Sequence, residues 1–199
     1  VLVAARGPRM LELAGELADI VHIAAPFLGE RYIDGCIERI ATGAARARRR
    51  LDDLEIDLSL SAAVLEDGEE ARRLAKVVTA YGIIWMAGVE RYARQRPSWT
   101  VPDELAVPGE LVERLATSWD MWSGDPLPDE CAALMDDAVL ALFGVAGTPA
   151  ECAPRLRALL ARHPEVTGLR LKLPPLSGPT SAPGYGALVE GVAAALADA

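Results

Sequence analysis

The stretch VLVAARGPRMLELAGELADIVHIAA, residues 1–25, contains a strand, a helix and a second strand in direct succession. Residues 1–5 and 19–25 are short apolar runs, and between them residues 8–18 carry apolar side chains at helical spacing. The apolar residues at that spacing are Met10, Leu11, Ala14 and Leu17. Because strands that alternate with helices are typical of a parallel α/β sheet, we expect such a sheet here.

The same alternation continues along the rest of the chain. A helix is expected over residues 30–50, ending in the basic run Arg46 to Arg50, and a strictly alternating strand over residues 55–65. A helix then begins at Asp67 and Gly68. Later, Thr148 has the sequence context of a helix N-cap, with Pro149 and Glu151 in the first turn. TGLRLKLP, residues 167–174, is the last of four expected principal strands, and a helix follows it.

Residues 84–137 interrupt this pattern. Three prolines within them, Pro97, Pro102 and Pro108, predict loops or short helices. Tryptophans gather here too, and we expect them to pack in a cluster of their own rather than to form a substrate platform. They are Trp85, Trp99, Trp119 and Trp122. The chain is therefore expected to be one domain over residues 1–199 with a helical, proline- and tryptophan-rich insertion at 84–137.

The composition excludes several classes of protein. A net charge of -9 argues against a nucleic-acid partner, which needs a basic face. No apolar run is long enough to span a membrane, and we expect no membrane association. Three widely spaced cysteines, Cys36, Cys131 and Cys152, match neither a zinc site nor a disulfide framework. We expect buried, reduced thiols, no bound metal and a cytoplasmic protein.

Two strands carry polar residues at every second position. If Ile56, Leu58 and Leu60 face helices, then Asp57, Ser59 and Ser61 point to the other side of the sheet. In the last strand Leu169, Leu171 and Leu173 would likewise leave Arg170 and Lys172 on that side. This pattern predicts an ion pair between Asp57 and Arg170, with His22 on the same face. It fits the interior of a parallel barrel, although an open sheet with one solvated face is an alternative.

The turn between the first strand and the first helix has the outline of a phosphate site. Ala5 ends the strand, Arg6 and Gly7 make the turn, and Pro8 begins the helix. Free amides at a helix N-terminus attract anions, and Arg6 adds a positive charge. Many α/β proteins have such a turn with nothing bound, so a purely structural role is the alternative.

Three segments together resemble the luciferase-like monooxygenase superfamily. They are VLVAARGPRMLELAGELAD, LEDGEEARRLAK, and FGVAGTPAECAPRLRALL followed by VTGLRLKLP. They occur in the family's order and span nearly the whole chain apart from the proline-rich middle. The resemblance is closest to the deazaflavin-dependent branch typified by methylenetetrahydromethanopterin reductase. It implies that this α/β chain is the C-terminal half, strands five to eight, of a TIM-type (β/α)8 barrel.

The resemblance also implies a function and a site. It implies an oxidoreductase that transfers hydride with coenzyme F-420, an 8-hydroxy-5-deazaflavin, and that holds the cofactor's phosphate at Ala5, Arg6, Gly7 and Pro8. A flavin mononucleotide (FMN) monooxygenase and a non-catalytic half-barrel that binds ligands or another subunit are the alternatives. Lys172 is a candidate for binding a cofactor or an anionic substrate, on geometry alone, and a structural role as a partner of Asp57 is the alternative.

Two further expectations accompany this reading. His22 departs from the family's usual sequence, and a hydrogen-bonded core histidine is the alternative to a substrate-binding one. We expect a small-molecule substrate and catalytic residues that precede Val1. A half-barrel would also expose unpaired strand edges, so we expect the chain to need an N-terminal half or a second copy of itself.

Overall fold

A computed structural model of the chain describes residues 1–24, 27–87, 107–175 and 181–197. Strands and helices alternate as expected in the first part: β1 (Leu2–Ala5), α1 (Pro8–Leu17), β2 (Ile20–Ile23), α2 (Glu30–Arg46), a short 3-10 turn (Leu51–Asp53) and β3 (Glu55–Val64). The remaining elements are α3 (Gly68–Ala87), α4 (Gly109–Ser118), α5 (Asp129–Ala133), α6 (Asp137–Phe143), β4 (Gly144–Gly147), α7 (Pro149–Arg162), β5 (Gly168–Lys172) and α8 (Ser181–Ala197).

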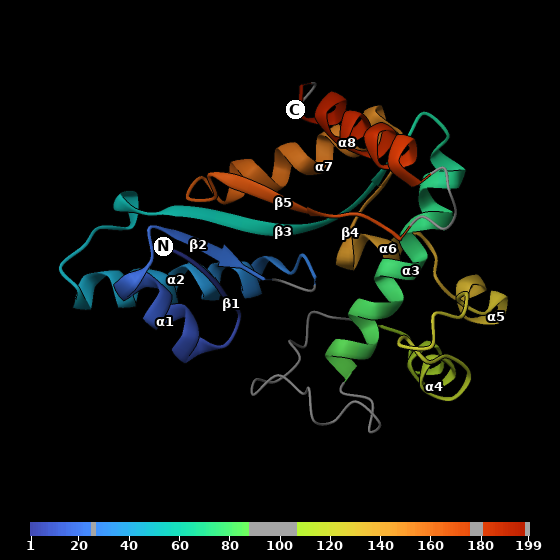
Figure 1. Cartoon of the computed structure of the whole chain (residues 1–199), viewed down its shortest axis with the longest axis horizontal. Coiled ribbons are helices and arrows are strands. Elements are labelled where there is room, and N and C mark those ends of the chain that lie inside the picture. The colour runs from blue at the N-terminus through green and yellow to red at the C-terminus, as the bar shows by residue number, and fades with distance from the viewer. Residues whose placement is uncertain (25–26, 88–106, 176–180, 198–199) are drawn as a thin grey trace.

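The strands form one parallel sheet built around β3. The path β1-β2-β3-β4 has β5 paired with β3 as a branch. The first part of β3 pairs with β2, its middle with β5 and its last four residues with β4. In Figure 1, β3 and β5 run side by side across the molecule, and β1 and β2 lie next to the start of β3. The alternation of the sequence therefore predicted the parallel sheet correctly.

Separate groups of helices cover the sheet. Helices α1 and α2 pack on β1, β2 and the start of β3, where Ile56 and Leu58 join one apolar core. Helices α7 and α8 pack on the later part of β3 through Leu60. Helices α3 to α6 form a further apolar core beyond the end of β3 (Figure 1). The predicted direction of Ile56, Leu58 and Leu60 toward helices is confirmed.

Helices α1 and α2 cross closely because each has a glycine at the contact. A Cβ atom on Gly43 would lie 1.8 Å from the Glu12 carbonyl oxygen, and one on Gly15 would lie 2.1 Å from that of Ile40. Such distances leave no room for any side chain. Arg39 and Arg46 of α2 add ion pairs to Glu12 of α1, at 2.9 and 2.8 Å. This pair of helices holds β1 and the turn after it in place.

Some details differ from the sequence-based expectations. Helix α2 ends at Arg46, because Arg48 has a φ of 58° and breaks the helical path before Arg50. Strand β4 is a fifth strand that was not predicted. A Cβ atom on Gly144 would lie 2.1 Å from the Ser61 carbonyl oxygen, so glycine permits the close pairing that makes β4. The capping box of Thr148 and Glu151 is confirmed.

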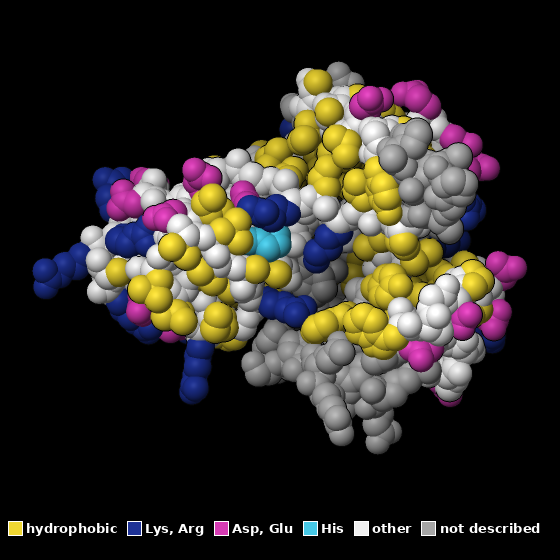
Figure 2. Space-filling model, in the orientation of Figure 1, with side chains coloured by type: hydrophobic (Ala, Val, Ile, Leu, Met, Phe, Trp, Pro, Cys, Tyr) yellow, Lys and Arg dark blue, Asp and Glu magenta, His cyan; other side chains and the backbone are white. Residues whose placement is uncertain are grey.

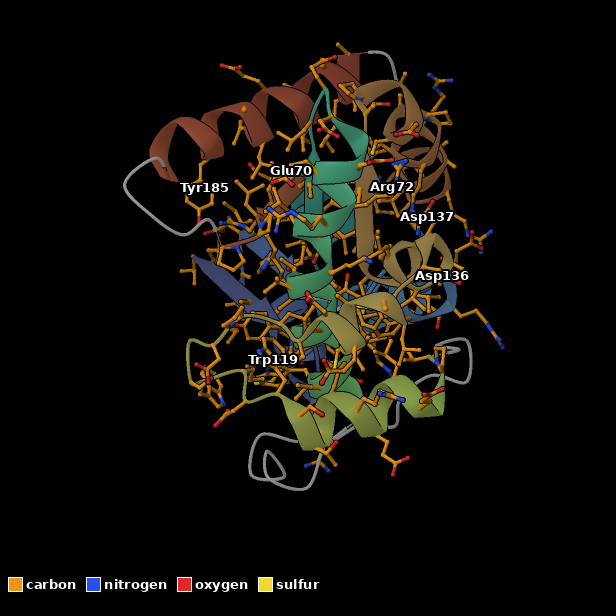
Figure 3. All side chains as sticks on the ribbon, turned by 90° about the vertical axis from the view of Figure 1, so that its right-hand side faces the viewer. Glu70, Arg72, Trp119, Asp136, Asp137 and Tyr185 are labelled. Carbon is orange, nitrogen blue, oxygen red and sulfur yellow. The ribbon has the colours of Figure 1, made fainter. Side chains whose placement is uncertain are left out.

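The expected insertion is largely helical where the structure describes it. Helix α3 continues to Ala87, and α4 and α5 follow before residue 137. Trp119 is buried among these helices (Figure 3), and its indole donates a hydrogen bond to the Asp125 carbonyl at 3.2 Å. Trp122 is exposed, so the expectation that it packs in the cluster is wrong, and Trp99 lies outside the described residues. Within the described parts of the chain, no helix has the length and apolar character to cross a bilayer.

Candidate active site on the polar face of the sheet

One face of the sheet carries the charged and polar side chains that the sequence singled out. In the parallel register His22 lies beside Asp57, Arg170 beside Ser59, and Lys172 beside Ser61. Neighbours in register point to the same side of a sheet. Figure 2 shows a histidine on this side of the molecule with lysine and arginine side chains around it. The structure thus brings together residues that lie far apart in the sequence.

Asp57 and Arg170 form the ion pair that the alternation predicted. The Arg170 Nε atom donates to an Asp57 carboxylate oxygen at 2.7 Å. Gly168, two residues before Arg170, gives the carboxylate its room: a Cβ atom there would lie 2.2 Å from Asp57 Oδ1. Because Asp57 is mostly shielded from solvent, it fixes the direction in which the Arg170 guanidinium extends.

His22 is held on the same face by Ser59. The Ser59 hydroxyl and His22 Nε2 are 3.1 Å apart, and Ser59 is buried. Burial lowers the pKa of His22, and the nearby charges of Arg170 and Lys172 lower it further. The imidazole is therefore neutral at neutral pH. This geometry matches the hydrogen-bonded histidine that was one of the two alternatives for this residue.

Lys172 lies in a partly buried and electropositive environment. Burial, together with the charge of Arg6, lowers the pKa of the Lys172 ammonium to about 8. Below pH 8 the Lys172 ammonium group keeps its positive charge, although its surroundings favour the neutral amine. A negatively charged ligand would raise the pKa of Lys172 again, because a nearby opposite charge favours the ammonium form.

The four residues of the predicted phosphate turn have different surroundings. The Ala5 side chain is buried in the core under α1 and α2. The Arg6 guanidinium stacks on the Trp85 ring of α3, 4.2 Å from its centroid. Gly7 is the N-cap of α1 and Pro8 its first residue, and both line a surface hollow with Arg9 and Met10. Gly7 is extended, with φ -84° and ψ 149°, so its backbone conformation does not itself require glycine.

The start of α1 has the chemistry of an anion site. No side chain caps it, and its first turn contains no acidic residue. Amides of the first turn lack partners within a helix, and the helix dipole favours negative charge there. The hollow and the Arg6 side chain therefore offer two neighbouring sets of groups that suit a phosphate. The hollow is lined by Gly7, Pro8, Arg9 and Met10, whereas the Arg6 guanidinium lies on the Trp85 ring.

A second hollow is lined by residues of α3, α6, β4 and α7. Its charged groups pair with one another: Arg72 lies 3.2 Å from Glu151 and 3.6 Å from Asp137, the latter pair visible in Figure 3. Arg155 donates to the Ala141 carbonyl, and burial lowers its pKa. Since two carboxylates already compensate the charge of Arg72, this hollow suits an anionic ligand less well than the polar face does.

The cysteines have no place in this site. All three are free and buried, as predicted. Burial raises the pKa of Cys36 and of Cys152 to about 11, so both thiols stay protonated and unreactive at neutral pH. Within the described ranges, no group of three or more histidine, cysteine or acidic side chains is placed to hold a metal ion.

The family follows from comparison with known proteins. The family model for luciferase-like monooxygenases matches residues 1–163. The chain belongs to the luciferase-like monooxygenase family. The superfamily resemblance drawn from the sequence is therefore confirmed, as is the α/β class with a parallel sheet that its barrel-forming relatives share.

Individual relatives agree with this assignment. A 5,10-methylenetetrahydromethanopterin reductase from Methanolobus tindarius is 28% identical over 158 residues, which are 78% of this chain and 43% of the relative. A coenzyme F-420-dependent tetrahydromethanopterin reductase from Methanopyrus kandleri superposes with a TM-score of 0.67 at 21% identity, covering 96% of this chain and 49% of that one. A riboflavin lyase solved with modified FMN superposes with a TM-score of 0.53 at 16% identity, covering 96% and 42%. The luciferase-like chain thus spans less than half the length of the curated relative.

Trp85 is the main site residue that sequence reasoning did not find. It was assigned to the insertion, yet its ring supports Arg6 from 79 positions away along the chain. No local pattern predicts such a contact. Asp57, Ser59 and Arg170 were placed on the correct face by strand alternation, but were not named as site residues.

Proposed function

We propose that the chain is part of an oxidoreductase that transfers hydride between coenzyme F-420 and a small-molecule substrate. Membership of the luciferase-like family supports an oxidoreductase, and the reductases among its relatives support this cofactor. The structural observation that carries the proposal is the cationic, partly buried polar face beside the uncapped start of α1. A deazaflavin with an anionic tail needs both features.

The residues fit the phosphate of such a cofactor. Gly7 and Pro8 present the backbone of the α1 N-terminus, which lacks a competing acidic side chain, and the side chain of Arg6, the residue before them, stacks on Trp85. The bound cofactor would supply the hydride chemistry. The residues of this chain would hold the anion, orient it against the sheet and, through Trp85, fix the position of Arg6.

We also propose that this chain, with its five described parallel strands rather than the four expected, supplies the C-terminal part of a barrel. In the described residues, β1 pairs with β2 alone. Apolar side chains are exposed around β1 and along α1: Val1, Leu2, Met10, Leu13 and Leu17. Further strand-helix units, from a preceding segment or a second copy, would cover these side chains and supply the catalytic residues.

Equilibrium titration with coenzyme F-420 and, separately, with FMN tests the function. Cofactor fluorescence is the readout, and Gly7→Trp is the variant that places a large side chain at the α1 N-terminus. Gly109→Trp is the matched control, since a Cβ atom at Gly109, the first residue of α4, has no neighbour within 4 Å. We expect binding of F-420 that Gly7→Trp weakens and Gly109→Trp does not.

Other outcomes assign the alternatives. Binding of FMN in preference to F-420, with the same dependence on Gly7, would support a flavin monooxygenase. A folded chain that binds neither cofactor, alone or with the units that complete the barrel, would contradict the proposal. It would favour a non-catalytic role in assembly.

A further inference from the structure

The polar face is electropositive although the protein is acidic. The chain as a whole carries a net charge of -9. Among the described residues of this face, Arg6, Arg170 and Lys172 contribute positive charges and Asp57 contributes a carboxylate. His22 stays neutral because its environment lowers its pKa. A local excess of positive charge in an acidic protein favours anions at that place.

The backbone directs the three cations toward one region. Arg170 and Lys172 are two residues apart on β5, so both point to the same face, beside Ser59 and Ser61 of β3. Arg6 follows Ala4 by two residues, and Ala4 lies in register beside His22. The charge of Arg6 is close enough to contribute to the lowered pKa of Lys172. Two elements at opposite ends of the sequence thus contribute to one charged region.

Trp85 orients the guanidinium group of Arg6, and Asp57 orients that of Arg170. Each contact uses only part of the guanidinium group, so hydrogen-bond donors remain for a ligand. Trp85 lies against the flat face of Arg6, whereas guanidinium hydrogen bonds are donated from the edge. Asp57 accepts a hydrogen bond from Nε of Arg170, and the Arg170 side chain remains 46% exposed. Gly168 secures this arrangement, because any larger residue would displace the Asp57 carboxylate. Supported cations of this kind suit phosphate or carboxylate groups.

We propose that Arg6, Arg170 and Lys172 form an anion-binding subsite on the polar face, separate from the hollow at the α1 N-terminus, for a phosphate or carboxylate group of a bound ligand. The subsite rests on the proposed function only in assuming that ligands bind on this face. It assigns the Arg6 side chain to the polar face and leaves the turn itself to backbone amides. The anionic group belongs either to the tail of the cofactor or to the substrate.

Sulfate is the probe for the subsite, because it keeps its double negative charge over the whole neutral and alkaline range. Thermal unfolding of the intact chain is followed against sulfate concentration, with chloride at equal ionic strength as the reference. Binding to the folded state raises the melting temperature in proportion to the logarithm of ligand concentration over Kd. General salt stabilisation acts on every variant alike and cancels in the comparison.

Lys172→Gln is the decisive variant, since it removes the charge and keeps a polar side chain of similar length. We expect it to weaken sulfate binding at least about tenfold, the value of one charge-assisted hydrogen bond. Arg9→Gln removes a charge from the α1 hollow instead, and Arg114→Gln removes a surface charge paired with Glu110 on α4. Equal sulfate affinity in the wild type and Lys172→Gln would overturn the subsite, as would a loss confined to Arg9→Gln.

A pH series adds a second readout. Burial and the charge of Arg6 lower the pKa of Lys172, and the charges of Lys172, Arg170 and Asp57 all act on His22, whose own pKa is lowered. Sulfate affinity of the wild type should fall as the pH rises above about 8, because the Lys172 ammonium loses its proton there. In Lys172→Gln the affinity should stay flat over the same range. An equal fall in both proteins would contradict the role of Lys172.

A final arm identifies the source of the anion. If sulfate weakens F-420 binding in the wild type but not in Lys172→Gln, the anionic tail of the cofactor occupies the subsite. If sulfate and F-420 bind independently, the anion belongs to the substrate. Absence of F-420 binding with an intact sulfate response would reject the proposed function and keep the subsite. If F-420 binds but the response to sulfate is the same in Lys172→Gln as in the wild type, the proposed function is kept and the subsite is rejected.

Discussion

The two faces of β3 differ in what they contribute to the protein. Toward the helices, Ile56, Leu58 and Leu60 are at most 1% exposed and join two apolar cores. On the other face, Asp57 and Ser59 hold Arg170 and His22 by hydrogen bonds. Ten consecutive residues thus stabilise the fold on one side and arrange charges for a ligand on the other. Substitutions at neighbouring positions of β3 should therefore change stability and ligand recognition separately.

The largest effect is expected on the helix face. Leu58→Ala removes a fully buried side chain from the core that β3 shares with α1 and α2. Loss of apolar burial together with the remaining cavity should lower the free energy of unfolding by about 2 to 5 kcal/mol. Urea denaturation followed by circular dichroism measures it. A cost below about 1 kcal/mol would show that the helix face does not dominate stability.

A gain in stability is expected on the polar face. The pKa of Lys172 is about 8 in the folded chain, against 10.5 as the ordinary value, so the unfolded chain binds more protons between these limits. The free energy of unfolding of the wild type should therefore include a contribution from Lys172 that rises as the pH rises between about 8 and 10.5. Lys172→Gln should be more stable at pH 7 by roughly 1 to 3 kcal/mol.

The pH dependence of that difference is the control. The advantage of Lys172→Gln should shrink as the pH rises above about 8 and vanish above 10.5, where Lys172 is neutral in both states. Denaturation of both proteins at each pH gives the difference directly. A constant difference across this range would mean that the charge of Lys172 is not the cause.

A smaller loss is expected at Ser59, which offers a matched comparison with its neighbour. Ser59 is 2% exposed and Leu58 0% exposed, so both substitutions act on buried positions. Ser59→Ala removes the hydroxyl 3.1 Å from His22 Nε2, which should cost about 1 kcal/mol. The same denaturation assay applies. A cost equal to that of Leu58→Ala would contradict the division between the two faces.

The smallest effect is expected on the outer side of α1. Leu17 is 63% exposed, so Leu17→Ser should change the free energy of unfolding by less than about 0.5 kcal/mol. Sedimentation in the presence of a polypeptide that completes the barrel should nevertheless show weaker association. Unchanged association would argue that α1 is not covered in the complete protein.

Much of the polar face could be predicted because a single rule places it. Strand alternation in residues 55–65 and 167–174 put Asp57 and Arg170 on one side of the sheet, and the predicted ion pair is present. His22 was placed on the same face, and the structure adds its contact with Ser59. In each case the information is contained within one strand and needs no knowledge of distant contacts.

The remaining features depend on contacts that no local pattern encodes. The four residues of β4 include two glycines, which have low strand propensity, and only close pairing with β3 makes them a strand. The stacking of Arg6 on Trp85 joins the end of β1 to α3, 79 positions further along the chain. The phosphate turn stays a prediction, to which the structure adds the contact of Arg6 with Trp85.

Amide chemical shifts of the isotope-labelled chain, measured with and without coenzyme F-420, test whether the polar face recognises the ligand. We expect the shift changes to concentrate on residues 6–10, 22–24, 57–61 and 170–172, with α2 and the hollow around Arg72 unchanged. Shifts centred on that hollow, or on the outer side of α2, would contradict the assignment of ligand recognition to the polar face.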